Sequence, residues 1–483
     1  MINWKIIFKV IGALMFIEAA LMLVCLAVSL LYAEDDSMAF LASVGAATVF
    51  GLLLRLAGRN DDNTLSRRDA YLVVTLTWIT FSLFGTLPFL ISGHVASFTD
   101  AYFETMSGFT TTGASVIDDV EALPHGLLFW RSLTQWIGGL GIVFFTIALL
   151  PSLVGGSVKV FSAEATGPIK TKLHPRLSTN SKWIWAVYLI ITTSCIASLK
   201  LAGMGLFDSI NYSMSAAATG GFATLNTSSE FSPLIEYILI FFCFISGANF
   251  TVLYASASKL RVKTLLENSE FRFYLFLVAA FTAFIAIQLF VHNGYGIEHA
   301  FRSSLFQVVS FITTTGLVSD DAGKWPHVTW VVLATCMFFG ACSGSTSGGL
   351  KCVRGVMLLK VMKNEFKQIL HPNAVLPMRI DGVNVAATKR VTLLAFLTVY
   401  LVLCLFCSFA MIAMGIDNTN AITITLSCMG NVGPTLGLEI GPMMSWSILP
   451  DAAKWICSAL MLIGRLEIFT VLVILTPAFW KEN

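Results

Sequence analysis

The feature of this sequence that most constrains its fold is a series of apolar runs, each long enough to cross a lipid bilayer. A helix needs about 20 apolar residues to span a hydrocarbon core of roughly 30 Å. The runs cover residues 8–31, 38–56, 70–92, 127–151, 183–203, 235–257, 271–292, 328–359, 391–414 and 450–477. The sequence therefore predicts an all-α polytopic membrane protein with about ten spanning helices.

Composition agrees with a membrane protein and excludes several other classes. Of the 483 residues, 56% are hydrophobic and 12% are charged, a balance far from that of a soluble globular domain. The formal net charge is only +2, so nothing favours nucleic acid as a partner. The ten cysteines are scattered through apolar segments without the spacing of a zinc site or a disulfide framework. We assign them no function.

Charged residues alternate between the loops on the two sides of the expected membrane. Lysine and arginine concentrate in every second loop, at 55–68, 159–182, 259–272 and 351–390, and Lys481 lies near the end of the chain. By the positive-inside rule these loops and both termini are cytoplasmic. The opposite loops carry the acidic residues, among them Glu34, Glu104 and Asp118. We expect solvated carboxylates there, with at most a diffuse attraction for cations.

Four shorter apolar segments lie between neighbouring spanning runs and share one pattern. They cover residues 98–110, 207–219, 298–312 and 418–429, which is too short to span. Near the end of each segment lies a serine, and a glycine follows it six positions later. The four copies read SGFTTTG from Ser107, SAAATGG from Ser215, SFITTTG from Ser310 and SCMGNVG from Ser427. One copy would mean little, but four copies in the same place predict a fourfold repeat of helix, re-entrant helix and helix.

A cation that crosses a membrane needs oxygen atoms to replace its hydration shell, and backbone carbonyls can supply them. Glycine tolerates the backbone angles of such a segment, and irregular backbone at membrane depth is allowed where it lines a cavity. The alternative is that these glycines only end short buried helices. Four matched copies favour a cation pathway.

On these repeats, the chain resembles the TrkH/KtrB/HKT superfamily of potassium transporters, and within it the bacterial TrkH type, over essentially the whole sequence. The resemblance implies a pseudo-fourfold pore with potassium bound by the backbone of four filter loops. In plant relatives a serine in the first repeat accompanies sodium selectivity, so Gly113 favours potassium. The filter residues expected from the resemblance are Thr111, Thr112, Gly113, Thr219, Gly220, Gly221, Thr314, Thr315, Gly316, Asn431, Val432 and Gly433.

The domain boundaries follow from the repeats. We expect two N-terminal transmembrane helices in residues 1–68, ahead of four pore repeats. The repeats cover residues 69–158, 159–262, 263–370 and 371–483.

The third repeat contains a segment too rich in glycine and serine to hold a regular helix well, GACSGSTSGGLK at 340–351. We expect an intramembrane loop in the conduction path, and the family resemblance implies that this loop obstructs the pore. Its expected gate residues are Gly340, Ser343, Gly344, Ser345, Gly348, Gly349 and, less strongly, Lys351.

Arg465 lies inside the last apolar run, where a charge costs roughly 2.5–3.5 kcal/mol to insert. A residue this costly is expected to face a cavity, although an ion pair with Glu467 is an alternative. Two positions along a helix point in different directions, which disfavours that pair. The resemblance assigns Arg465 to the gate, as a positive charge below the filter.

The sequence contains no catalytic constellation, so we expect transport and no enzymatic activity. The main alternative is a sodium- or proton-coupled carrier. Carriers tend to use inverted repeats and intramembrane carboxylates, whereas these repeats run parallel and only Glu18 and Glu467 lie clearly at membrane depth. The family resemblance further implies the bacterial inner membrane, a homodimer, and a cytosolic TrkA-type subunit that binds NAD or ATP. No organic cofactor is expected in this chain itself.

Overall fold

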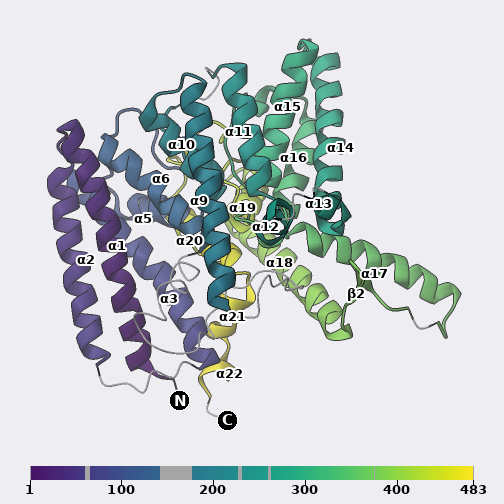
Figure 1. The fold of residues 1–483 in the computed structure, drawn as a ribbon, viewed down its shortest axis with the longest axis horizontal. Coiled ribbons are helices and arrows are strands. Elements are labelled where there is room, and N and C mark those ends of the chain that lie inside the picture. Colours follow the sequence, from purple (N-terminus) through teal and green to yellow (C-terminus); the bar gives the residue numbers. More distant parts are fainter. Residues whose placement is uncertain are drawn as a thin grey trace.

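The protein is described by a computed structural model, which covers residues 2–59, 66–141, 177–226, 231–258, 261, 263–374 and 376–481. The basic residues expected at 159–176 and the end of the apolar run at 142–151 lie outside the described residues. The N-terminal hairpin comprises α1 (Trp4–Tyr32) and α2 (Ser37–Ala57), packed along each other (Figure 1). The part of the chain described is mainly helical, as predicted.

Four units follow the hairpin, each with a spanning helix, a shorter pore helix and a second long segment. The first contains α3 (Arg67–Gly85), α4 (Leu87–Ser92), α5 (Phe98–Phe109) and α6 (His125–Leu140). The second contains α9 (Leu177–Leu201), α10 (Leu206–Ala218), α11 (Pro233–Ser246) and α12 (Phe250–Ser258). The third contains α13 (Lys263–Glu267), α14 (Ser269–His292), α15 (Ile297–Ile312), a 3-10 turn at Ala322–Lys324, α16 (His327–Phe339) and α17 (Cys352–Leu370). The fourth contains α18 (Ala387–Ala413), α19 (Asn418–Gly430), α20 (Asp451–Arg465), α21 (Phe469–Leu475) and α22 (Pro477–Trp480).

A small antiparallel hairpin precedes α18 and was not predicted. Its strands β1 (Arg379–Ile380) and β2 (Val383–Asn384) pair Arg379 with Asn384 and Ile380 with Val383. Each strand has only two residues, so the fold class is unchanged.

Helix starts in the described chain carry ordinary capping signals. Ser66 and Asp69 form a capping box at α3, where each side chain accepts a hydrogen bond from the backbone of the other residue. Asn268 caps α14 and Asp417 caps α19 through their side-chain oxygens. These caps fix where α3, α14 and α19 begin.

Six described helices are long and apolar enough to cross a membrane, and two bent pairs raise the number to eight. The runs expected at 235–257 and 450–477 are not continuous helices. The first bends by 100° between α11 and α12, and the second by 116° between α20 and α21. The α6 and α16 helices end at Leu140 and Phe339, and each is followed by a glycine with positive φ. Of these interruptions, the sequence analysis predicted only the one after α16.

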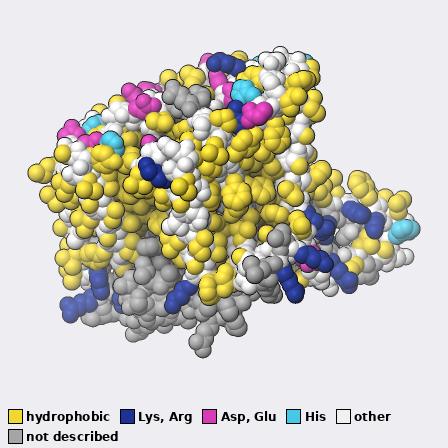
Figure 2. Space-filling model, turned by 45° about the horizontal axis from the view of Figure 1, so that its top comes forward, with side chains coloured by type: hydrophobic (Ala, Val, Ile, Leu, Met, Phe, Trp, Pro, Cys, Tyr) yellow, Lys and Arg dark blue, Asp and Glu magenta, His cyan; other side chains and the backbone are white. Residues whose placement is uncertain are grey.

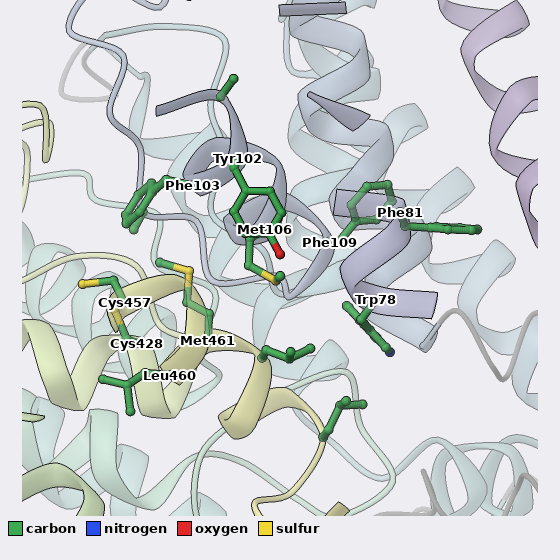
Figure 3. Close-up of a cluster of buried hydrophobic side chains, with 14 of the residues drawn as sticks. Trp78, Phe81, Tyr102, Phe103, Met106, Phe109, Cys428, Cys457, Leu460 and Met461 are labelled. Carbon is green, nitrogen blue, oxygen red and sulfur yellow. The ribbon is translucent and has the colours of Figure 1, made fainter. Parts of the chain in front are cut away.

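The units close into a ring, because the second long helix of each unit packs on the pore helix of the next. These contacts pair α6 with α10, α11 with α15, α16 with α19, and α20 with α5. One apolar core joins the N-terminal hairpin to the first and last units, and a second core joins the middle two. Figure 3 shows Phe103 and Met106 of the first pore helix lying near Leu460 and Met461 of the last unit.

The surface divides into zones. In Figure 2 an apolar belt lies between an end with most of the acidic side chains and an opposite end with most of the lysines and arginines. The start of α1 and the C-terminal helix α22 lie at the same end of the molecule (Figure 1). The α17 helix projects sideways from the bundle, and several lysines lie along it.

Candidate functional site

Each pore helix is followed by a loop with the same backbone conformation. The repeat glycines have φ of +81° at Gly113, +87° at Gly221, +79° at Gly316 and +100° at Gly433. Two residues earlier, φ is +55° at Thr111, +53° at Thr219, +55° at Thr314 and +55° at Asn431. Residues with a Cβ rarely adopt positive φ, and each such residue costs about 1–3 kcal/mol. The same costly geometry at four equivalent positions shows that the loops are one structural element used four times.

Hydrogen bonds at the serine position hold the turn of each repeat. The N–H of the residue before each glycine donates to the serine carbonyl oxygen, at 2.8–2.9 Å, in all four loops. In two repeats the serine hydroxyl also accepts from the glycine N–H. Ser215 Oγ accepts from Gly221 at 2.9 Å and Ser427 Oγ accepts from Gly433 at 3.0 Å. In the third repeat Ser310 Oγ instead donates to the carbonyl oxygen of Leu317 at 2.6 Å. The backbone at this position anchors the turn in all four repeats. The hydroxyl adds a bond in repeats two, three and four, whereas Ser107 Oγ has no hydrogen-bond partner within the described residues.

The four loops meet in a closed ring. A Cβ built on Gly113 would lie 2.2 Å from the carbonyl oxygen of Gly220. The same test places Gly221 against Thr315 O at 2.2 Å, Gly316 against Val432 O at 2.0 Å, and Gly433 against Thr112 O at 2.5 Å. Each glycine therefore leaves room for a carbonyl oxygen of the next repeat, in the order one, two, three, four and back to one.

The ends of the four pore helices give the ring a partial negative charge. The pore helices α5, α10, α15 and α19 end immediately before the loops, and the C-terminal end of a helix carries a partial negative charge. The described residues contain no group of three or more His, Cys, Asp or Glu placed to hold a metal ion. The atoms that lie closest to the Cβ positions of the four repeat glycines are backbone carbonyl oxygens.

All twelve predicted filter residues lie in these four loops, and two side chains join loops to their neighbours. Asn431 Nδ2 donates to Thr112 Oγ1 at 3.0 Å and to the Met461 carbonyl oxygen at 2.9 Å. Gln135 of α6 was missed by the sequence analysis. Its Nε2 donates to Gly220 O at 2.6 Å and its Oε1 accepts from Phe222 N at 3.1 Å. The sequence signal that could have identified Gln135 is a polar amide side chain inside the apolar run 127–151.

A cavity adjoins the glycine ring, with about 150 Å³ of water-accessible space. Its lining includes all four repeat glycines, together with Ser115, Asp118, Arg131, Phe222 and Asn226. The cavity therefore adjoins all four loops of the ring.

Asp118 supplies a negative charge to this cavity. Hydrogen bonds from the Ser445 and Ser447 hydroxyls lower the pKa of its carboxyl below the ordinary 3.8. The carboxyl therefore stays ionised between pH 5 and 8.

We expect Asp118→Asn to raise the half-saturating cation concentration of uptake about threefold at low ionic strength. The effect should be smaller at high salt, because salt screens the attraction that the variant loses. Concentration dependence of uptake in proteoliposomes at two ionic strengths measures this, and identical values for parent and variant would contradict it.

The loop at 340–351 packs against residues that come just before the repeat glycines, and it contacts three of the four repeats. Gly348 N donates to Thr314 Oγ1 at 2.7 Å, and Thr346 Oγ1 donates to Ala217 O at 3.0 Å. A Cβ on Gly348 would lie 2.3 Å from Gly430 O. The predicted non-helical segment is therefore present, and it is packed directly onto the second, third and fourth pore loops or pore helices.

Glu270 of α14 holds the loop at 340–351 by hydrogen bonds. This residue was not predicted from the sequence. The Glu270 carboxylate accepts from Ser343 N at 2.5 Å, Ser343 Oγ at 2.7 Å and Val353 N at 3.0 Å. One acid thus fixes both ends of the loop. Of the other predicted gate residues, Gly340, Gly344 and Gly349 supply positive φ, and Ser345 Oγ donates to Cys342 O at 2.6 Å.

Arg465 is not at the centre of a helix, as the sequence suggested, because α20 ends at this residue. Its guanidinium donates to Thr346 O at 2.9 Å, Gly138 O at 2.5 Å and Gly139 O at 2.8 Å. Glu467 pairs with Arg354 of α17. Arg465 therefore ties the loop at 340–351 to α6 of the first unit. The Lys351 ammonium is buried and donates to the Ser347 carbonyl within the same loop.

The fold and the site define a class, a multi-pass helical membrane protein with four equivalent loops that meet in one ring. The chain belongs to the TrkH family of cation transport proteins, whose family model matches residues 36–481. It is 34% identical to the Trk system potassium uptake protein TrkH of Escherichia coli (strain K12), covering 99% of this chain and 100% of the relative. It is 35% identical to TrkH of Halomonas elongata, covering 99% of both chains. The crystal structure of the potassium transporter TrkH from Vibrio parahaemolyticus superimposes with a TM-score of 0.89 at 32% identity, covering 99% of this chain and 100% of that one.

Proposed function

We propose that this protein translocates potassium across the bacterial inner membrane through a gated, channel-like pore with a backbone-carbonyl filter. The observation that carries this proposal is the closed ring, in which a glycine of each repeat makes room for a carbonyl of the next. Such a ring offers replacement oxygens to a dehydrated cation. Potassium is the proposed cargo because relatives that match the whole chain are potassium uptake proteins, and because Gly113 occupies the first filter position.

The loop at 340–351 is the proposed gate. It lies at the inner end of the ring, and its Thr346, Ser347 and Lys351 are almost fully buried. Arg465 adds a positive charge at the same level and holds the loop by its carbonyl. In this proposal the closed pore combines a steric obstruction with an electrostatic barrier, and opening requires the loop to leave its hydrogen bonds.

The proposed orientation places both termini and α17 in the cytoplasm. The basic end of the molecule, visible in Figure 2, agrees with the positive-inside rule. The acidic end with Asp118 and the outer cavity then faces the outside. Potassium enters there and is driven inward by the membrane potential, worth about 2.3 kcal/mol per charge per 100 mV.

A homodimer and a cytosolic TrkA-type subunit that binds NAD or ATP are part of the proposal. The projecting α17 exposes apolar side chains at Leu359, Met362, Phe366, Ile369 and Leu370. An apolar face of this kind is typical of an interface, and a second copy is its proposed occupant. Light scattering of the detergent-solubilised protein should give twice the chain mass, and a single-chain mass would contradict the dimer. No organic cofactor is proposed in the chain itself.

A coupled carrier is the second candidate, and one observation favours it. Glu18 in α1 is fully buried, and both its carboxylate oxygens lack a hydrogen-bond partner within the part of the chain that the structure describes. Buried carboxylates at membrane depth often carry protons in transporters. Glu18 lies in the N-terminal hairpin, however, outside the four loops of the ring.

The experiment that separates the two candidates is cation flux into proteoliposomes of the purified protein. A pore predicts potassium and rubidium flux that needs neither sodium nor a proton gradient, with sodium and lithium much slower. Flux that stops when sodium is absent and the proton gradient is collapsed would establish the carrier instead.

A further inference from the structure

An arginine lines the outer cavity of a protein proposed to admit cations. Arg131 of α6 is 2% exposed and belongs to the cavity lining. Its partner Glu104 of α5 is 1% exposed, with Arg131 Nε donating to Glu104 Oε1 at 2.8 Å. The sequence analysis expected Glu104 to be a solvated loop carboxylate, which is wrong. It lies on the buried face of a pore helix, three residues before the repeat serine.

The Arg131 side chain joins two filter loops at equivalent positions. Its NH2 donates to Ser115 Oγ at 3.2 Å and its NH1 donates to Ala223 O at 3.1 Å. Ser115 and Ala223 each lie two residues after the filter glycine of their repeat. The guanidinium carbon also lies 4.2 Å from the ring centroid of Phe222. Arg131 therefore holds the outer ends of the first and second loops at a fixed separation.

Glu104 completes the arrangement within the first loop. Its two carboxylate oxygens accept from Ser115 Oγ at 3.0 and 3.1 Å, and Oε2 accepts from Val116 N at 3.0 Å. The equivalent positions in the other repeats, three residues before the serine, are Tyr212, Gln307 and Ile424. The fourfold symmetry of the ring is thus broken by an ion pair in one quarter.

We propose that the Glu104–Arg131 pair is a specificity-determining brace, which sets the spacing of filter loops one and two and neutralises the arginine charge beside the cation path. The inference rests on the proposed function as a cation pore. A neutral pair can position backbone without repelling the cargo, whereas a buried guanidinium without its partner is a strong local positive charge. Charge beside a narrow entrance acts on cation concentration and rate.

The positive charge of Arg131 predicts a specific change in potassium flux for each variant of the pair. In Glu104→Gln the arginine keeps its position near Ala223 but loses its counter-charge. We expect potassium flux to fall about tenfold at 10 mM ionic strength and less at high salt, because the repulsion is screened. In Arg131→Gln the carboxylate remains and the link to Ala223 is lost, so we expect the potassium-to-sodium flux ratio to fall with little loss of total flux. The double variant should recover flux relative to Glu104→Gln but keep the low ratio.

The test measures potassium and sodium flux of the full-length protein and these three variants in proteoliposomes at low and high concentrations of an impermeant salt. The matched control is Glu298→Gln, because Glu298 also pairs with an arginine on a pore helix, but is 60% exposed on the outer face. The control should match the parent. Thermal unfolding of each variant in detergent identifies any that fail to fold.

The outcomes separate the inference from the proposed function. Salt-dependent loss in Glu104→Gln, with recovery in the double variant, supports the brace. If the folded single and double variants lose the same amount of potassium flux at low and high salt, the brace is refuted and the proposed pore is unaffected. Absence of selective flux in the parent would instead contradict the proposed function.

Discussion

Gly113→Ser is expected to abolish potassium-selective flux while the protein still folds. The φ of Gly113 is +81°, and the new Cβ would lie 2.2 Å from the carbonyl oxygen of Gly220. The clash is with backbone of the neighbouring repeat, so no side-chain rotation relieves it. Either loop one or loop two must move, which displaces a carbonyl from the ring. We expect potassium flux to fall at least about tenfold and the ratio of potassium to sodium to approach one.

Gly93→Ser is the matched control for this prediction. Gly93 has almost the same backbone angle, φ +78°, but a Cβ there has no heavy atom within 4 Å. The two variants therefore carry a similar conformational cost and differ in the contact with a carbonyl. Flux assays on both, at matched reconstituted amounts, measure the effect. Equal, wild-type selectivity in Gly113→Ser would show that the glycine ring is not the selective element.

Arg465→Ala is expected to give the largest gain of flux. The guanidinium donates three hydrogen bonds to backbone carbonyls, two of them on α6 and one on the loop at 340–351. A hydrogen bond from a charged group contributes about 1.5–3 kcal/mol. A net loss of about 3 kcal/mol from the closed state would shift the closed-to-open ratio by roughly 100-fold. We also expect removal of the positive charge to lower the electrostatic barrier to a cation.

Arg465→Lys provides the control, because it keeps the charge but cannot reproduce the geometry of the guanidinium. If the hydrogen bonds hold the gate, both variants conduct more than the parent. If the charge alone forms the barrier, Arg465→Ala conducts more and Arg465→Lys does not. Basal potassium flux without any partner subunit is the measurement. Folded Arg465→Ala protein with parental flux would refute the proposed role of Arg465 in the gate.

The fourfold repeat could be predicted from sequence because its constraint is local. Each loop has a glycine with positive φ and a serine six residues earlier, and these serines, Ser107, Ser215, Ser310 and Ser427, can be recognised in the sequence. The pore helices were also placed correctly, since their length distinguishes them from spanning helices. The non-helical segment at 340–351 could be predicted for the same reason, because glycine and serine cluster in a short window.

The interactions that hold the site together could not be predicted in this way. The carbonyls that bind Arg465 belong to residues up to 327 positions away, and a backbone carbonyl carries no sequence signature. The break after Arg465 is made by Glu467 and Ile468, which have positive φ without being glycine. Glu104 was taken for a loop residue because its partner Arg131 lies in a different helix. In each case tertiary packing decided the role of the residue.

In the proposed pore, the four carbonyls of Thr112, Gly220, Thr315 and Val432 surround a cation site. Anomalous diffraction from crystals of this protein grown with rubidium in place of potassium tests the claim directly. We predict an anomalous peak on the axis between these four carbonyls, and a weaker one or none when crystals of Gly113→Ser are treated in the same way. Rubidium ordered elsewhere along the chain, with no density at the ring, would contradict the claim.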